Sequence, residues 1–235
     1  MDKVFLSPHF DDVALSCGGM VAMAAAAGER VLVVTVCGAL PAAEARSALT
    51  DKIHAARGFS DGIAYVSARR EEDRAAALVL GARIEWGGSL DAIYRNPAHY
   101  DRSRTLLGPP APGDPLVAEA ASLIAELRRR FPRAELYAPL GTGHIDHRAV
   151  SHAARMAQGP TCLYQEFPYR GAPYAAVSPD KAELAAVAPG FFDAWLRAVL
   201  CYRSQLRGLF GGEDGARAAL VAHAQSTGGT RIWRL

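Results

Sequence analysis

Two short clusters of histidine and aspartate in this sequence contain the residue types that metal-assisted acid–base chemistry needs. In the first cluster, His9, Asp11 and Asp12 lie within four residues, directly after the apolar run 4–6. A histidine and an aspartate can hold a divalent metal, and a second aspartate beside them can act as a base. Capping of the helix expected next would account for one aspartate, but not for the histidine or for two adjacent acids.

The second cluster contains His144, Asp146 and His147 and follows the apolar run 135–139. Each cluster lies where a predicted strand gives way to a predicted helix. The carboxyl ends of parallel strands meet at one edge of an open α/β sheet, where ligands bind. Any single histidine could equally be a buried, hydrogen-bonded residue, but two such clusters at equivalent corners favour a shared metal site.

The segments around the clusters predict an α/β fold. Short apolar runs predict strands at 4–7, 31–36, 83–86, 135–139, 161–167 and 182–187, and periodic stretches predict helices at 13–27, 41–57, 69–81, 116–130, 147–157, 191–206 and 215–225. The first strand, helix and strand form a right-handed βαβ unit. We expect a mostly parallel sheet in a single domain over residues 1–235. Gly18 and Gly19, inside the first helix, are expected to admit another backbone at close range.

The composition argues against several function classes. A net charge of +2, from 26 basic and 24 acidic residues, gives no basic surface for nucleic acid. The apolar run 21–27 is too short to span a bilayer, and no signal peptide is visible. Four scattered cysteines without a CxxC pair are typical of buried thiols in a reducing compartment. We therefore expect a cytoplasmic protein with no nucleic-acid or membrane partner.

Two polar segments are further candidates for the site. Residues 89–114 form a long irregular stretch, which we interpret as a lid or substrate-specificity segment, with disorder as the alternative. Gln165, Glu166 and Arg170 lie at the end of the strand predicted at 161–167 and could line the same site.

The chain resembles the PIG-L/LmbE-like deacetylases. The resemblance rests on Pro8-His9-Phe10-Asp11-Asp12 with Cys17-Gly18-Gly19, on His144-Ile145-Asp146-His147, on Arg69-x-x-Glu72, on Tyr202-x-Ser204-Gln205 and on Gly228-Gly229-x-Arg231-x-Trp233. It implies a Rossmann-like sheet with helices on both faces. It also implies a zinc-dependent hydrolase that removes an N-acetyl or other N-acyl group from a small amino sugar or amino-sugar conjugate.

The same resemblance assigns the metal site and its base. His9, Asp12 and His147 would be the ligands of Zn²⁺, with Fe²⁺ as an alternative metal. Two imidazoles and one carboxylate leave positions open, as a catalytic metal requires. Asp11 would be the general base that takes a proton from the attacking water.

The resemblance implies four further roles. His144 would stabilise the tetrahedral oxyanion or protonate the leaving amine. Asp146 would orient His144 and raise its pKa, so that His144 sets the alkaline limb of the pH profile. Arg69 and Asp91 match positions that bind substrate.

Two positions depart from the family pattern. Val13 stands where the family has an acid after its two aspartates, and Thr142 stands where some relatives carry a tyrosine that polarises the scissile carbonyl. Tyr94, Tyr164 and Tyr169 are the candidates to replace that tyrosine from a loop.

Three other functions stay open. With the same metal site, the enzyme could be an amidase of a thiol–sugar conjugate or an O-deacetylase. A Rossmann-like sugar-nucleotide-binding protein without hydrolytic activity is the alternative of another class. The intact set of candidate residues favours an enzyme, and a homo-oligomer is compatible with the sequence.

Overall fold

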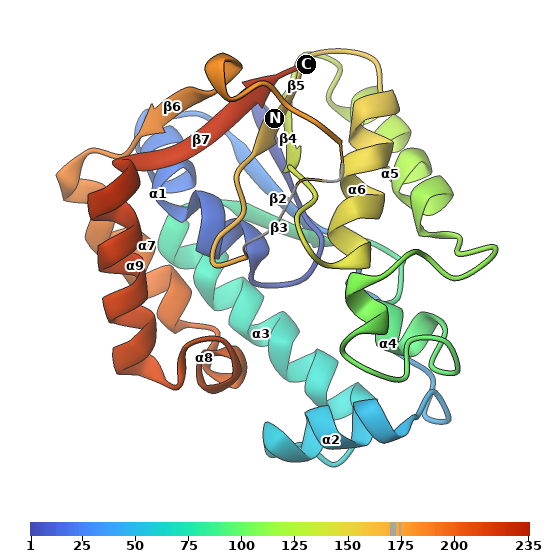
Figure 1. The fold of residues 1–235 in the computed structure, drawn as a ribbon. Coiled ribbons are helices and arrows are strands. Elements are labelled where there is room, and N and C mark those ends of the chain that lie inside the picture. Colours follow the sequence, from blue (N-terminus) through green and yellow to red (C-terminus); the bar gives the residue numbers. More distant parts are fainter. Residues whose placement is uncertain (170–172, 174) are drawn as a thin grey trace.

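A mixed sheet forms the middle layer of the protein in a computed structural model that describes residues 1–169, 173 and 175–235 (Figure 1). Within these residues the sheet has seven strands in the order β3-β2-β1-β4-β5-β7-β6. The strands are β1 Lys3–Ser7, β2 Val31–Thr35, β3 Arg83–Trp86, β4 Glu135–Pro139, β5 Thr161–Tyr164, β6 Glu183–Ala186 and β7 Gly229–Arg234. The first five are parallel, and β7 runs antiparallel to both β5 and β6.

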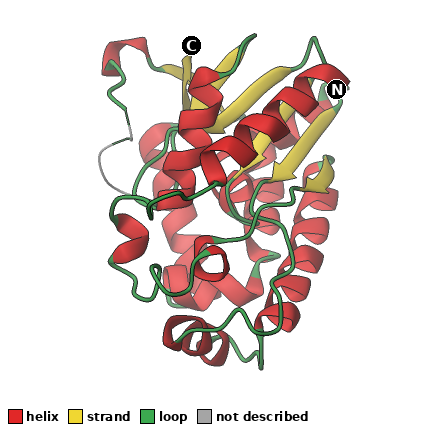
Figure 2. Cartoon of the chain, turned by 90° about the vertical axis from the view of Figure 1, so that its right-hand side faces the viewer, coloured by secondary structure: helices red, strands yellow, loops and turns green. Residues whose placement is uncertain are grey.

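Helices cover both faces of the sheet, as expected (Figures 1 and 2). They are α1 Asp12–Ala26, α2 Ala48–Ala56, α3 Gly62–Leu80, α4 Ala92–Arg95, α5 Leu116–Arg130, α6 Ile145–Met156, α7 Phe192–Leu200, α8 Arg203–Phe210 and α9 Glu213–Thr227. Phe5 on β1 packs toward α1 and α3, while its neighbours Val4 and Leu6 pack toward α5 and α6. Because both faces are buried, the central residues 4–6 of β1 are all apolar.

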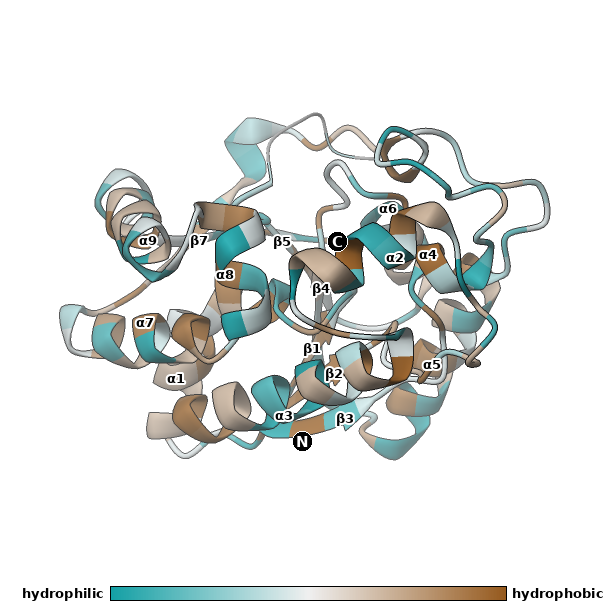
Figure 3. Cartoon of the chain, turned by 90° about the horizontal axis from the view of Figure 1, so that it is seen from below, coloured by the Kyte–Doolittle hydropathy of each residue, from teal (hydrophilic) through white to brown (hydrophobic). Residues whose placement is uncertain are grey.

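Several boundaries differ from the predicted ones. Helix α3 begins at Gly62 rather than residue 69, because Asp61 caps it by accepting the N–H of Ala64. Hydrophilic residues interrupt the apolar stretches of α3 (Figure 3). Two of its charged residues, Arg69 and Asp73, are buried. The helix predicted at 41–57 is confined to α2, which a capping box at Ser47 begins.

The C-terminal region differs more strongly from the predicted elements. The helix predicted at 191–206 is broken into α7 and α8 at Tyr202, which has a non-helical backbone conformation. The Tyr202 hydroxyl donates to Asp73 on α3. The strand predicted at 161–167 ends at Tyr164. Strand β7 was not predicted, because it lies on the antiparallel side of the sheet and contains a glycine and two arginines.

Gly18 and Gly19 were expected to admit another backbone at close range, and this expectation is wrong. A Cβ at Gly18 would lie 2.4 Å from Cδ1 of Trp195, and one at Gly19 would lie 2.7 Å from Cγ1 of Val187. The two glycines therefore admit side chains of the C-terminal region rather than another backbone.

Residues 89–114 are ordered and contain α4 and a short 3₁₀ helix at Thr105–Leu107. Ala92, Tyr100 and Ala111 are buried and pack against Ile145 of α6. No helix of the described residues is long and apolar enough to cross a membrane. Cys17, Cys37 and Cys162 are buried free thiols, and Cys201 is half-buried.

Candidate active site

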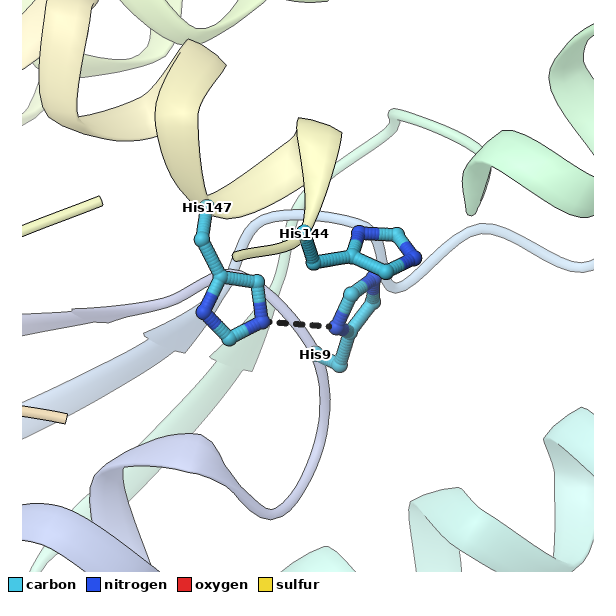
Figure 4. Close-up of side chains that lie close together, drawn as sticks. All are labelled: His9, His144 and His147. Atoms are coloured by element: carbon cyan, nitrogen blue, oxygen red, sulfur yellow. Dashed lines mark hydrogen bonds between the residues drawn. The ribbon is translucent and has the colours of Figure 1, made fainter. Parts of the chain in front are cut away.

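The two histidine–aspartate clusters meet at the carboxyl ends of β1 and β4. These strands are neighbours in parallel register, with Phe5 opposite Tyr137, so the loops that follow them lie side by side. Asp12 is the first residue of α1. His144 caps the N-terminus of α6, and His147 lies in the first turn of that helix. The structure therefore brings together residues that are far apart in the sequence (Figure 4).

Three atoms that could bind a metal converge at this place. Nε2 of His147 lies 3.2 Å from Nδ1 of His9 and 3.3 Å from Oδ2 of Asp12, and Nδ1 of His9 lies 3.5 Å from the same oxygen. Ligands about 2.0–2.1 Å from a tetrahedral zinc are separated by about 3.4 Å. The other oxygen of Asp12, Oδ1, is buried and has no hydrogen-bond partner among the described residues. This donor set fits a divalent metal.

Hydrogen bonds from neighbouring groups fix these candidate ligands. The backbone N–H of His9 donates to Oδ2 of Asp12 at 2.7 Å. Nδ1 of His147 lies 2.6 Å from Oε1 of Glu166, whose other oxygen accepts the N–H groups of Gly141 and Thr142 at 2.8 Å. An Nδ1–H held by Glu166 leaves the Nε2 lone pair of His147 free for a metal. The only sequence signal for Glu166 was its place at the polar end of the strand predicted at 161–167. Arg170 lies outside the described residues.

Asp146 contacts His9 rather than His144, which differs from the expected arrangement. Its Oδ2 lies 3.1 Å from Nε2 of His9 and 3.9 Å from Nδ1 of His144. His144 instead caps α6, because its Nδ1 accepts the backbone N–H of Asp146 at 3.2 Å. The carboxylate of Asp146 is therefore placed to orient the candidate metal ligand His9.

The expected rise in the pKa of His144 was also wrong. Burial lowers the pKa of His144 to about 4 and outweighs the opposing effect of Asp146. The ring is therefore neutral near pH 7. Because Nδ1 accepts a hydrogen bond, the proton of the neutral ring resides on Nε2. His144 can donate a hydrogen bond from Nε2 without being a cation.

Asp11 is held by Arg69. Nη2 of Arg69 donates to Oδ1 of Asp11 at 2.9 Å, and both side chains are buried. Burial raises the pKa of Asp11, and the charge of Arg69 opposes this rise. The guanidinium of Arg69 also lies over the Phe10 ring, 5.0 Å from its centroid. Substrate contact by Arg69 stays a prediction, because this guanidinium already pairs with Asp11.

Asp91 lies at the edge of the same site. Its Oδ1 accepts the N–H of Ile93 and so caps α4, while its Oδ2 lies 3.7 Å from Nε2 of His9. The Asp91 side chain is 19% exposed, more than the other carboxylates of the site. A substrate role for Asp91 likewise stays a prediction.

Of the three candidate tyrosines, only Tyr169 lies at the ligands. Its ring centroid is 4.8 Å from that of His147. The Tyr94 hydroxyl instead pairs with His54 at 2.6 Å, and the Tyr164 hydroxyl donates to the carbonyl of Leu6 at 2.8 Å.

Two of the motifs quoted for the resemblance dock on each other. On α3, Glu72 accepts the backbone N–H and the hydroxyl of Ser204, at 2.7 and 2.6 Å. Asp73 accepts the Tyr202 hydroxyl at 2.7 Å. These bonds tie α8 to the helix that carries Arg69, so the C-terminal region supports the position of Asp11.

Comparisons with known proteins agree with this site. The profile of the PIG-L family, described as GlcNAc-PI de-N-acetylase, matches residues 4–158. The 2'-N-acetylparomamine deacetylase of Niallia circulans is 29% identical over 230 residues, which cover 89% of this chain and 82% of that protein. The enzyme of the same name from Streptomyces fradiae is 31% identical over 175 residues, covering 72% of this chain and 57% of that protein.

Solved structures of deacetylases are similar to this chain over almost its whole length. The zinc-inhibited form of teicoplanin deacetylase Orf2 superposes with a TM-score of 0.82 at 29% identity, covering 98% of this chain and 96% of that one. The A40926 pseudoaglycone deacetylase Dbv21 has a TM-score of 0.80 at 30% identity, covering 100% and 97%.

Proposed function

This chain belongs to the PIG-L family, and from that premise we propose that it is a metal-dependent hydrolase that removes an N-acetyl or other N-acyl group from a small amino-sugar conjugate. The observation that carries the proposal is the convergence of Nδ1 of His9 and Nε2 of His147 on Oδ2 of Asp12, whose other oxygen, Oδ1, is buried and unpartnered among the described residues.

His9, Asp12 and His147 would hold the metal, with Zn²⁺ as the first candidate and Fe²⁺ as the alternative. A bound zinc ion supplies Lewis acidity, which polarises the acyl carbonyl and acidifies water. The protein orients the two imidazoles through two carboxylates. Asp146 contacts Nε2 of His9 and Glu166 contacts Nδ1 of His147, in each case the ring nitrogen that does not face the metal position.

Asp11 is the proposed general base. Arg69 holds Oδ1 of its carboxylate, and Oδ2 would take a proton from the attacking water. As the water oxygen bonds to the acyl carbon, that proton moves to Asp11. Asp11 then returns it to the nitrogen as the C–N bond breaks, so that an amine and a carboxylic acid leave.

His144 is the proposed donor to the oxyanion. The neutral ring carries its proton on Nε2, because Nδ1 accepts the N–H of Asp146. A preorganised neutral donor stabilises the charge that develops on the acyl oxygen. Of the two roles expected for His144, the lowered pKa supports oxyanion stabilisation over proton delivery.

The relatives support an amino-sugar substrate. Two are 2'-N-acetylparomamine deacetylases, and the structural neighbours include deacetylases of teicoplanin and of A40926 pseudoaglycone. We therefore expect the substrate to be an N-acylated amino sugar that is attached to a larger organic compound.

The test is a panel of N-acetylated amino sugars that includes 2'-N-acetylparomamine, assayed for released primary amine with zinc-loaded protein. Asp11→Asn protein is the control for contaminating activity. A matched panel of O-acetyl and thiol-conjugated sugars distinguishes the O-deacetylase and amidase alternatives. Zinc-loaded protein that binds these sugars but releases no product would contradict hydrolysis and favour the binding protein.

A further inference from the structure

Arg95, at the end of α4, joins the segment 89–114 to the metal site. Its Nη2 donates to Oδ1 of Asp146 at 2.7 Å. Its Nε and Nη2 form a bidentate pair with Asp114 at 2.9 and 3.0 Å, and its Nη1 donates to the carbonyl of Leu90 at 2.6 Å. The side chain is only 6% exposed, so these bonds are formed away from water.

The other oxygen of Asp146 connects the same segment to His9. Oδ2 accepts the backbone N–H of Ala92 at 3.0 Å and lies 3.1 Å from Nε2 of His9. An Nε2–H of His9 donated to this carboxylate leaves the Nδ1 lone pair directed at Asp12 and His147. Asp146 thus receives two hydrogen bonds from the segment 89–114 and one from the imidazole.

Hydrogen bonds of Tyr100 and Asp114 stabilise the part of the segment that follows α4. The Tyr100 hydroxyl donates to Asp114 and accepts the backbone N–H of Ala111 at 2.9 Å. Tyr100 is fully buried. If the segment opens, Asp146 loses the hydrogen bonds from the guanidinium of Arg95 and the N–H of Ala92. His9 is then the nearest donor left to it.

We propose that Arg95 is a positioning residue that couples the folded state of segment 89–114 to metal binding at His9. The inference rests on the proposed metal site. Outer hydrogen bonds to a metal-ligating histidine typically change metal affinity 10- to 100-fold. Coupling between two equilibria is reciprocal, so metal binding must also stabilise the closed segment.

The experiment measures zinc affinity by chelator competition and amide hydrogen exchange of residues 92–111, with and without zinc. In the wild-type protein, zinc should slow exchange in this segment. Arg95→Gln should weaken zinc binding by about 10- to 100-fold and remove the zinc-dependent protection. Arg95→Lys should recover part of the affinity, because lysine keeps the charge but not the bidentate fork.

Arg102→Gln is the matched control, because Arg102 lies in the same segment and its exposed side chain pairs with the adjacent Asp101. Tyr100→Phe removes one bond to Asp114 and tests the same coupling if Arg95→Gln does not fold. Equal zinc affinity and equal protection in Arg95→Gln and Arg102→Gln, or an unchanged Tyr100→Phe protein, would overturn the inference while leaving the metal site intact. Wild-type protein that binds no zinc would refute the metal site itself, and the coupling with it.

Discussion

Oε1 of Glu166 lies 2.6 Å from Nδ1 of His147, and both side chains are fully buried. The same carboxylate accepts two backbone N–H groups from the loop after β4. Glu166 therefore fixes the ring of His147 and the loop that carries it. Glu166 thus links the segment that follows β5 to a candidate metal ligand on α6.

Replacing Glu166 with glutamine should weaken zinc binding about 10- to 100-fold, because a neutral amide holds the Nδ1–H of His147 less strongly. Chelator competition measures the change. Glu183→Gln is the control, since Glu183 is an exposed glutamate on β6 that pairs with Arg234. Similar zinc affinities in the two variants would contradict the role of Glu166.

Replacing Asp11 with asparagine should lower kcat by about 100-fold or more while zinc content stays unchanged. The side chain keeps its size but can no longer accept a proton. Turnover with the best substrate of the acetylated panel, together with elemental analysis, gives the result. Undiminished turnover in zinc-loaded Asp11→Asn protein would rule out Asp11 as the base.

Arg69→Gln should move the acidic limb of kcat/KM to higher pH. Burial raises the pKa of Asp11, and the charge of Arg69 opposes this, so removal of that charge raises the pKa further. A base acts only when it is deprotonated, so activity is lost at a higher pH than in the wild type. Arg70→Gln is the control, because Arg70 donates to the carbonyl of Gly38 instead. An acidic limb that stays in place in Arg69→Gln contradicts the electrostatic role.

His144→Ala should lower kcat about 100- to 1,000-fold, the usual loss for one oxyanion donor, without removing the alkaline limb of the pH profile. The pKa of His144 is lowered to about 4, so the ring is already neutral over the range in which that limb is recorded. A full pH profile of the variant provides the test. Loss of the alkaline limb in this variant would show that His144 acts as a cationic acid.

Gly18→Ala should destabilise the protein, by up to about 3 kcal/mol. The new methyl group would overlap Trp195, and overpacking costs about 1–3 kcal/mol, while alanine recovers up to about 1 kcal/mol of helix propensity. The midpoint of urea unfolding measures the difference. Gly88→Ala is the control, because a Cβ there meets nothing within 4 Å. Equal midpoints would mean that Trp195 can move aside.

The sequence predicted the parallel half of the fold and the meeting of the two clusters, because strand ends and helix starts are local signals. His9 and His147 could be assigned to one site since β1 and β4 are parallel neighbours. The partners of Asp146 could not be predicted. Arg95 reaches it from a loop whose path depends on the packing of Tyr100, and such packing leaves no periodic pattern.

Strand β7 has a consequence for how the chain is made on the ribosome. It pairs with β5 on one side and β6 on the other, and Cys162 and Leu163 of β5 are buried in the finished sheet. Until residues 229–234 have left the exit tunnel, one edge of β5 has no partner, and such an edge is a template for pairing with other chains. The nascent protein is therefore expected to need chaperone protection until synthesis of β7 is complete.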